Sequence, residues 1–204
     1  SLIFGTIVLG FLIKYERRKH SRKTEADNNA FWSREAAANS VRRKDISQLP
    51  YIRIPFEELP FIPDAAGEIK TCQNQLLALK GIPLLNLSSM SNTDLKMEYG
   101  VANLPKLSEC DEACNNMYRI IANLGYYLSK EGYHDEAVAF LEFGIRAGSD
   151  LSRNYYVLAD EYLLAHRYDD VRQLITRAES ITTPMKSAII RELTGKLATT
   201  EVKP

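Results

Sequence analysis

The sequence feature that most constrains the fold is a pattern of 34 residues that occurs twice between Tyr118 and Ala178. The two copies match at one constant offset. The matched pairs are Leu124 and Leu158, Gly125 and Ala159, Ala137 and Val171, Leu141 and Ile175, and Gly144 and Ala178. A repeat of this length is typical of a helical solenoid, because one helix pair cannot bury its apolar face alone and must stack on a neighbour. The pattern therefore predicts a binding surface and not a reaction.

Apolar spacing and turn residues predict where the helices of each copy begin and end. The expected helices span residues 108–130, 134–147, 152–165, 169–179 and 184–197. The first could start at Ser108 or at Cys110. Gly148 accepts the left-handed backbone conformation that often ends a helix. Pro184 is compatible with the first turn of the last helix.

In these residues the two copies resemble the tetratricopeptide repeat (TPR) family. The matching residues are Leu124, Gly125, Leu128, Gly132, Tyr133, Ala137, Leu141 and Gly144 in the first copy, and Tyr155, Leu158, Ala159, Tyr162, Tyr168, Val171, Ile175 and Ala178 in the second. Val171 departs from the usual Ala, and the closing Pro is absent at Ser149 and displaced by one at Pro184. The resemblance covers residues 108–198 and implies an all-α fold, a TPR-like solenoid of helical hairpins with a C-terminal capping helix. Hairpins of a related repeat type are the alternative.

In that family, the first helices of the repeats line a concave groove that holds an extended or helical peptide. Carried over position by position, the resemblance implies that the partner-binding residues are Arg119, Tyr126, Lys130, Arg153, Tyr156 and Asp160. Aromatic and arginine side chains are common energetic centres of interfaces, and the cations favour an acidic partner. The alternative is solvated surface charge and tyrosines half-buried against their neighbours. Ala122 and Tyr126 stand where some members clamp a C-terminal carboxylate, which disfavours that role.

The N-terminal residues predict a membrane anchor. Leu2 to Ile13 carry no charge, and six cations follow within the next ten residues. Twelve helical residues span only about 18 Å, so we expect a span that extends upstream of Ser1. A signal peptide places its basic residues before the apolar core, and here the order is reversed. A buried core helix is the alternative.

Positive charge marks the cytoplasmic flank of a span, which predicts a single-pass protein of the cell membrane with its C-terminal domain in the cytoplasm. Residues 14–44 carry a charge of about +6, and the remainder about −6. The expected membrane-proximal residues are Lys14, Arg17, Arg18, Lys19 and Trp32, with the cations at anionic lipid. Phe31 and Trp32 lie either in the interfacial zone or folded back onto the domain.

Four prolines between residues 50 and 63 predict an extended, Pro-rich strap. Its apolar side chains, which include Ile52, Phe56 and Phe61, predict that the strap packs on the solenoid. The alternative is that it occupies the solenoid's own peptide groove. Helical spacing over 67–79 and 93–99, the second capped by Ser91 or Asn92, predicts two packing helices before the repeats.

The sequence contains no known catalytic or nucleotide-binding motif, so we expect no catalytic residues and no cofactor. Cys72, Cys110 and Cys114 lack a zinc spacing and fit a reducing compartment, where we expect Cys110 and Cys114 to pack as small apolar residues. His134 and His166 fall at turns between repeat helices. Nucleic-acid binding is disfavoured because the folded part is the acidic one.

Together these features predict the organisation of the chain. Its expected parts are a transmembrane anchor (1–13), a basic juxtamembrane segment with a short helix (14–48), a strap with packing helices (49–107), the repeats with the capping helix (108–198) and a tail (199–204). The layout resembles uncharacterised bacterial single-span proteins. We expect a membrane-anchored adaptor or scaffold that faces the cytoplasm and binds a partner protein or peptide. A self-assembling structural membrane protein and an enzyme without a recognisable motif are the alternatives.

Overall fold

The computed structural model describes residues 27–201 of the chain. Helices form its regular structure, and the one β interaction among the described residues is an isolated antiparallel bridge between Ile52 and Leu84. The predicted all-α class is therefore confirmed. The described chain divides into two compact units. Unit 1 contains residues 27–47 and 90–105, and unit 2 contains residues 48–89 and 106–201.

Unit 1 contains helical residues 27–39, helix α3 (Asn92–Tyr99) and a 3-10 turn, η1 (Val101–Asn103). Ser91 caps α3: its hydroxyl accepts a hydrogen bond from the Asp94 amide, and the Asp94 carboxylate accepts one from the Ser91 amide at 3.1 Å. This reciprocal arrangement satisfies two backbone donors that a helix start would otherwise leave free. Of the two caps that the sequence allowed, the structure uses Ser91.

Charged side chains attach helical residues 27–39 to α3 within unit 1. Glu35 accepts a hydrogen bond from the Thr93 hydroxyl at 2.7 Å and forms an ion pair with Lys96. Arg34 forms a second ion pair with Asp94 at 2.5 Å. The Lys96 bond, followed by the Thr93 bond, lowers the pKa of Glu35. These partners are about 60 residues apart in sequence, so helical periodicity gives no sign of them.

Phe31 and Trp32 are exposed in unit 1. Trp32 is 65% exposed and Phe31 53%, and their rings meet edge to face at a centroid distance of 5.3 Å. The apolar stretch and the expected membrane-proximal cations Lys14, Arg17, Arg18 and Lys19 lie outside the described residues. Within residues 27–201, no helix is both long and apolar enough to cross a membrane.

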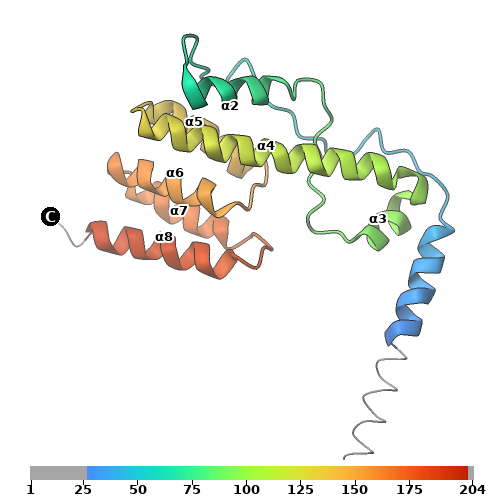
Figure 1. The fold of residues 1–204 in the computed structure, drawn as a ribbon. Coiled ribbons are helices and arrows are strands. Elements are labelled where there is room, and N and C mark those ends of the chain that lie inside the picture. The colour runs from blue at the N-terminus through green and yellow to red at the C-terminus, as the bar shows by residue number, and fades with distance from the viewer. Residues whose placement is uncertain (1–26, 202–204) are drawn as a thin grey trace, which may run out of the picture. The chain divides into compact units, whose positions relative to one another are not determined.

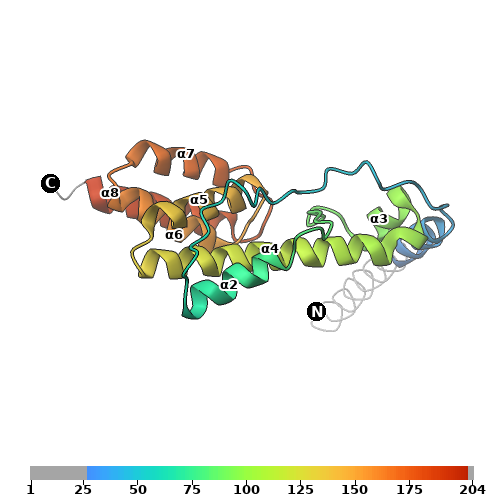
Figure 2. The same cartoon turned by 90° about the horizontal axis from the view of Figure 1, so that it is seen from above.

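Unit 2 contains most of the helices. They are α2 (Gly67–Leu77), α4 (Leu104–Lys130, in unit 2 from Lys106), α5 (His134–Arg146), α6 (Ser152–Leu164), α7 (Tyr168–Ala178) and α8 (Lys186–Glu201). Figure 1 shows them in layers, with α2 beside α4, then the hairpins α4/α5 and α6/α7, then α8. Figure 2 shows α2 running along α4 in a second view.

The predicted boundaries are closest for α5, α6 and α7, which agree with the structure to within one residue at each end. The prediction was wrong at the start of α4, which begins four residues before Ser108 and includes Pro105 in its first turn. Proline is tolerated there because the first amides of a helix have no intrahelical partner. The last helix also differs, since α8 begins at Lys186 and continues to Glu201.

The first hydrophobic core of unit 2 is built by α2, α4, α5 and the strap, residues 49–63. Leu59 of the strap is buried, and Phe61 contacts the fully buried Phe140 of α5 edge to face at 5.4 Å. Gln73 of α2 exchanges two hydrogen bonds with the backbone of Ile62, at 2.8 and 3.0 Å. The prediction that the strap packs on the helices is confirmed. The contacts of Phe61 and Ile62 lie with α5 and α2.

The second core of unit 2 is formed by α5, α6, α7 and α8. Tyr155, Leu158 and Ala159 supply the α6 side of this core and are at most 1% exposed. Ile189 and Leu193 close it from α8 and are fully buried. The helix pairs are therefore continuous in space, because α5 contributes to both cores.

Candidate functional site

The first helix of each hairpin and the last helix share one side of unit 2, which we call the α4–α6–α8 face. Arg153 of α6 donates a hydrogen bond to the Asn123 side chain of α4 at 2.7 Å. Lys196 of α8 forms an ion pair with Asp160 of α6 at 2.6 Å. These contacts bring together residues from three helices that are separated by 30 and 36 positions in the sequence. The helical repeat therefore collects its polar side chains on a single surface.

Tyr126 lies at the centre of the cations on this face. Lys130 Nζ lies 5.0 Å from the centroid of the Tyr126 ring, and Arg153 Cζ lies 5.4 Å from it. Both distances are within the range of a cation–π interaction, which attracts the positive group to the ring. A side-chain hydrogen bond with Tyr126 also raises the pKa of Lys130, so this ammonium group stays charged at neutral pH.

The positive charge of the face is not compensated by carboxylates. In the described part of the chain, Arg119, Lys130 and Arg153 have no acidic partner, and Arg119 and Arg153 are exposed. The ion pair of Asp160 with Lys196 is neutral as a whole. The described part of the α4–α6–α8 face therefore presents three cations without a carboxylate partner, and a half-buried tyrosine ring, to any molecule that approaches it.

Two of the residues that the sequence placed in the site are engaged by neighbours. Asp160 is paired with Lys196, so it is not free to select a basic group on a partner. Tyr156 is half-buried and packs against the second core, which limits it to an edge contact. The structure thus brings the six predicted residues onto helices α4 and α6, but it leaves mainly Arg119, Tyr126, Lys130 and Arg153 available.

Sequence reasoning missed Asn123 and Lys196. Asn123 precedes Tyr126 by one helical turn and orients Arg153, a role that its spacing from Tyr126 could have suggested. Lys196 lies in the last helix, 36 residues from Asp160, and no periodic signal connects the two. Their partnership depends on how α8 packs on α6.

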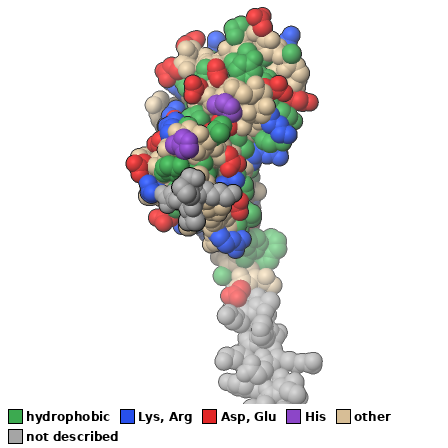
Figure 3. Space-filling view, turned by 90° about the vertical axis from the view of Figure 1, so that its left-hand side faces the viewer, with side chains coloured by type: hydrophobic (Ala, Val, Ile, Leu, Met, Phe, Trp, Pro, Cys, Tyr) green, Lys and Arg blue, Asp and Glu red, His purple; other side chains and the backbone are tan. Residues whose placement is uncertain are grey.

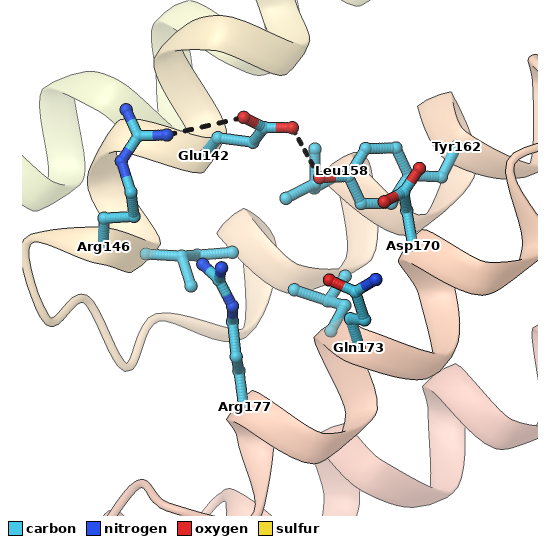
Figure 4. Close-up of a pocket in the computed structure, with 9 residues that line it drawn as sticks. Glu142, Arg146, Leu158, Tyr162, Asp170, Gln173 and Arg177 are labelled. Atoms are coloured by element: carbon cyan, nitrogen blue, oxygen red, sulfur yellow. Dashed lines mark hydrogen bonds and ion pairs between the residues drawn. The ribbon is translucent and has the colours of Figure 1, made fainter.

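On another side of unit 2, a polar network joins α5, α6 and α7 around a small cavity of about 100 Å³. Glu142 accepts a hydrogen bond from the Tyr162 hydroxyl at 2.7 Å and pairs with Arg146 at 3.5 Å and Arg167 at 3.8 Å. Burial, then the bond to Glu142, raises the pKa of Tyr162. Figure 4 shows the side chains of Glu142, Arg146, Tyr162 and Asp170. Asp170 also binds Arg167 at 2.7 Å. Both carboxylates are satisfied by cations and a hydroxyl, an arrangement suited to holding helices together.

The histidines and cysteines of unit 2 occupy structural positions. Figure 3 shows histidine side chains exposed at one end of unit 2. His134 Nδ1 lies 2.7 Å from the buried carboxylate of Glu161. Cys72, Cys110 and Cys114 are free thiols in the interior, as the packing prediction for Cys110 and Cys114 required, and burial raises the pKa of Cys114 to about 11. Within residues 27–201, no three metal-binding side chains gather into a candidate metal site.

Comparison of the chain with known proteins gave no match to a family model, to a curated protein or to a solved structure.

Proposed function

We propose that this protein is a TPR-like interaction adaptor whose α4–α6–α8 face binds an acidic segment of a partner protein. The observation that supports this function is the set of cations around Tyr126. Among the described residues, Arg119, Lys130 and Arg153 have no carboxylate to neutralise them. A segment with carboxylates at matching positions would supply that charge.

The chemistry of these side chains suits recognition of a peptide. Arginine presents a planar fork of donors that matches a carboxylate, and Asn123 already holds Arg153 in one orientation. Less side-chain entropy is then lost when a partner binds. The Tyr126 ring offers apolar area between the cations, so acidic residues with apolar neighbours would fit better than a purely charged chain.

Attachment to a membrane would make a weak interaction at this face effective. The apolar stretch Leu2–Ile13 with its basic flank supports a single-pass anchor and a cytoplasmic position for the folded part. An anchored binder meets its partner at a raised effective concentration, so occupancy rises without additional contacts. In this proposal the protein recruits or holds an acidic partner at the membrane surface.

The two ends of the helix stack support an adaptor over a self-assembling element. A solenoid that polymerises end to end needs an apolar surface at each terminus, whereas terminal repeats of isolated solenoids carry a polar outer face. The exposed residues of α8 include Arg191, Thr194 and Gly195. At the other end, α2 exposes mainly polar residues, Lys70, Thr71, Asn74 and Gln75, together with the apolar Leu77.

Peptide binding tests the proposal directly. The full chain in mild detergent would be titrated into a fluorescent peptide of alternating glutamate and leucine, with binding followed by anisotropy. We expect binding that weakens as salt is added, and a loss of about tenfold or more when Tyr126→Ala and Arg153→Ala are combined. Arg153→Glu should weaken binding further, because it places a like charge against the peptide.

Two controls make the result specific. Arg172→Ala removes an exposed arginine from α7, a helix that is not part of the α4–α6–α8 face, and should bind as the parent protein does. A peptide of alternating lysine and leucine tests whether charge sign matters. Equal affinity for both peptides, or an unchanged affinity in Arg153→Glu, would exclude the α4–α6–α8 face as the binding surface.

A further inference from the structure

A second concave region of unit 2 is large enough for a small molecule. Its volume is about 620 Å³, and it is lined by residues of the segments 86–89, 145–150 and 177–182 and by Tyr155. We call it the polar cavity. It adjoins the smaller cavity of Figure 4, since Ile145, Arg146 and Arg177 line both. Ligand sites in proteins commonly enclose about 300–1,000 Å³.

The polar cavity contains one cation without an acidic partner. The neighbouring arginines at the helix ends are paired: Arg146 with Glu142 at 3.5 Å, and Arg167 with Asp170 at 2.7 Å. Arg177, at the end of α7, has no carboxylate partner in the part of the chain that the structure describes. Figure 4 shows its side chain extending from α7 toward the space below Arg146. A ligand anion placed there would contact one free guanidinium and lie near a second.

The same cavity contains one carboxylate without a cationic partner. Asp150 follows the turn that ends α5 and is half-buried, and no ion pair or hydrogen bond to its side chain is found among residues 27–201. A carboxylate with reduced access to water gains from a cation or donor close by. Among the described residues, the polar cavity therefore contains two charges without a partner. A ligand anion could pair with Arg177, and a ligand cation could pair with Asp150.

Tyr155 lines the polar cavity together with Asp150 and Arg177. Its side chain is 1% exposed, and its hydroxyl donates a hydrogen bond to the Ser149 carbonyl oxygen at 3.3 Å. Burial and then Asp150 raise the pKa of Tyr155, whereas Arg177 acts in the opposite direction. Both charges thus act at one buried hydroxyl on the cavity wall. Asp150 and Arg177 line the same cavity, so they belong to one site.

We propose that the polar cavity binds a small zwitterion, with an anionic carboxylate at Arg177 and an ammonium group at Asp150. The apolar side chains of Ile145 and Ile181 line the cavity and can contact a short methylene chain between the two ends. The hydroxyl of Thr182 can donate a further hydrogen bond to the carboxylate, whereas the Ser180 hydroxyl already donates to the backbone carbonyl oxygen of Arg177 at 2.7 Å. An amino acid or a short amino carboxylate has this chemistry. This site is independent of the α4–α6–α8 face.

Calorimetric titration of the full chain in mild detergent tests the site. The probes are the unbranched amino carboxylates from glycine to 6-aminohexanoate, together with the simple carboxylate and the simple amine of each chain length, which each lack one charged end. We expect at least one amino carboxylate to bind, and its single-ended counterpart to bind about tenfold more weakly or worse. Arg177→Gln should abolish the advantage given by the carboxylate, and Asp150→Asn the advantage given by the ammonium group.

Matched controls use the same changes at exposed residues outside the polar cavity. Arg191→Gln on α8 and Asp169→Asn at the start of α7 should leave binding unchanged. Thermal unfolding of each variant would verify that it is folded. The proposal fails if no probe depends on both of its charged ends, or if Arg177→Gln and Asp150→Asn bind as the parent does. The proposal also fails if Asp150 and Arg177 form an ion pair with each other. In that case the stability effects of Arg177→Gln and Asp150→Asn would not be additive in the absence of ligand, and no probe would bind.

Discussion

The hairpins α4/α5 and α6/α7 follow the same 34-residue pattern, yet different residues occupy the position where the two helices of a hairpin approach each other closely. Gly125 of α4 faces Leu141 of α5, and a methyl group added at Gly125 would come within 2.5 Å of the Leu141 side chain. The equivalent position of the second hairpin is Ala159, which is fully buried with its methyl group in place. The first hairpin is therefore packed more closely at this layer than the second.

The turns of the two hairpins also have different residues at equivalent positions. Gly132 has a φ of 82°, and His166, at the equivalent position, has a φ of 56°. In both turns the next residue donates a backbone hydrogen bond across the helix end, from Tyr133 to Leu128 at 2.9 Å and from Arg167 to Tyr162 at 2.7 Å. Both turns thus contain a residue with a left-handed backbone conformation at this position, but only the first turn uses glycine there. The comparison teaches that the repeat preserves backbone geometry more strictly than residue identity.

The hairpins also differ in what covers them. The first buries the strap and α2 in its core, and the second is covered by α8. The strap has almost no backbone pairing of its own beyond the bridge from Ile52 to Leu84 and short turns, so its position depends on side chains such as Phe61. The first hairpin is therefore the part of unit 2 that should respond most to loss of a single aromatic contact.

The largest expected effect follows from Phe140→Ala. This change removes a fully buried ring and its contact with Phe61, and we expect it to lower the free energy of unfolding by about 3–5 kcal/mol. It should also release the strap, because Phe61 loses its partner. Limited trypsin digestion after the exposed Arg53 would report the release, with denaturant unfolding reporting the stability.

The matched change in the second hairpin is Leu174→Ala. Leu174 is buried at the position equivalent to Phe140, and its loss should cost about 2–5 kcal/mol. Cleavage after Arg53 should stay as slow as in the parent protein. If both variants expose Arg53 equally, the strap does not depend on the first core in particular, and the contrast between the hairpins is lost.

A smaller effect should come from Gly125→Ala. The new methyl group would overlap Leu141, which is fully buried. Overpacking costs about 1–3 kcal/mol and the better helix propensity of Ala returns about 1 kcal/mol, so a net loss of about 0–2 kcal/mol is expected. Gly195→Ala in α8, where an added methyl group meets open space, should instead stabilise the protein in the same denaturation assay.

The smallest effects concern the two turns, and they should have opposite signs. Gly132→Ala places a side chain on a left-handed backbone and should cost about 1 kcal/mol. His166→Gly relieves such a conformation and should stabilise by up to about 1 kcal/mol, less whatever the His166 contact with Tyr168 contributes. Urea unfolding of both variants would measure this difference. Equal shifts in the same direction would show that the two turns are not equivalent.

Much of unit 2 could be predicted from sequence because its signals are local. Apolar spacing predicted α5, α6 and α7, and Gly148 ends α5 with a φ of 97° as expected. The proline-rich composition predicted a strap that packs through its apolar side chains. The candidate site could be predicted only in outline: the family resemblance implied Arg119, Tyr126, Lys130 and Arg153 as partner-binding residues, which remains a prediction, but it gave no sign that Lys196 pairs with Asp160.

The sequence alone determined the period of the helices, their order and which residues of the first helices face outward. These properties depend on interactions within a few residues along the chain, where periodicity and turn chemistry are sufficient. Only the tertiary structure decided that the strap lies with α2 and α5, that α3 pairs with Glu35, and that Arg177 and Asp150 line one cavity. Such contacts join residues tens of positions apart, and their formation depends on how whole helices pack, which no local pattern specifies.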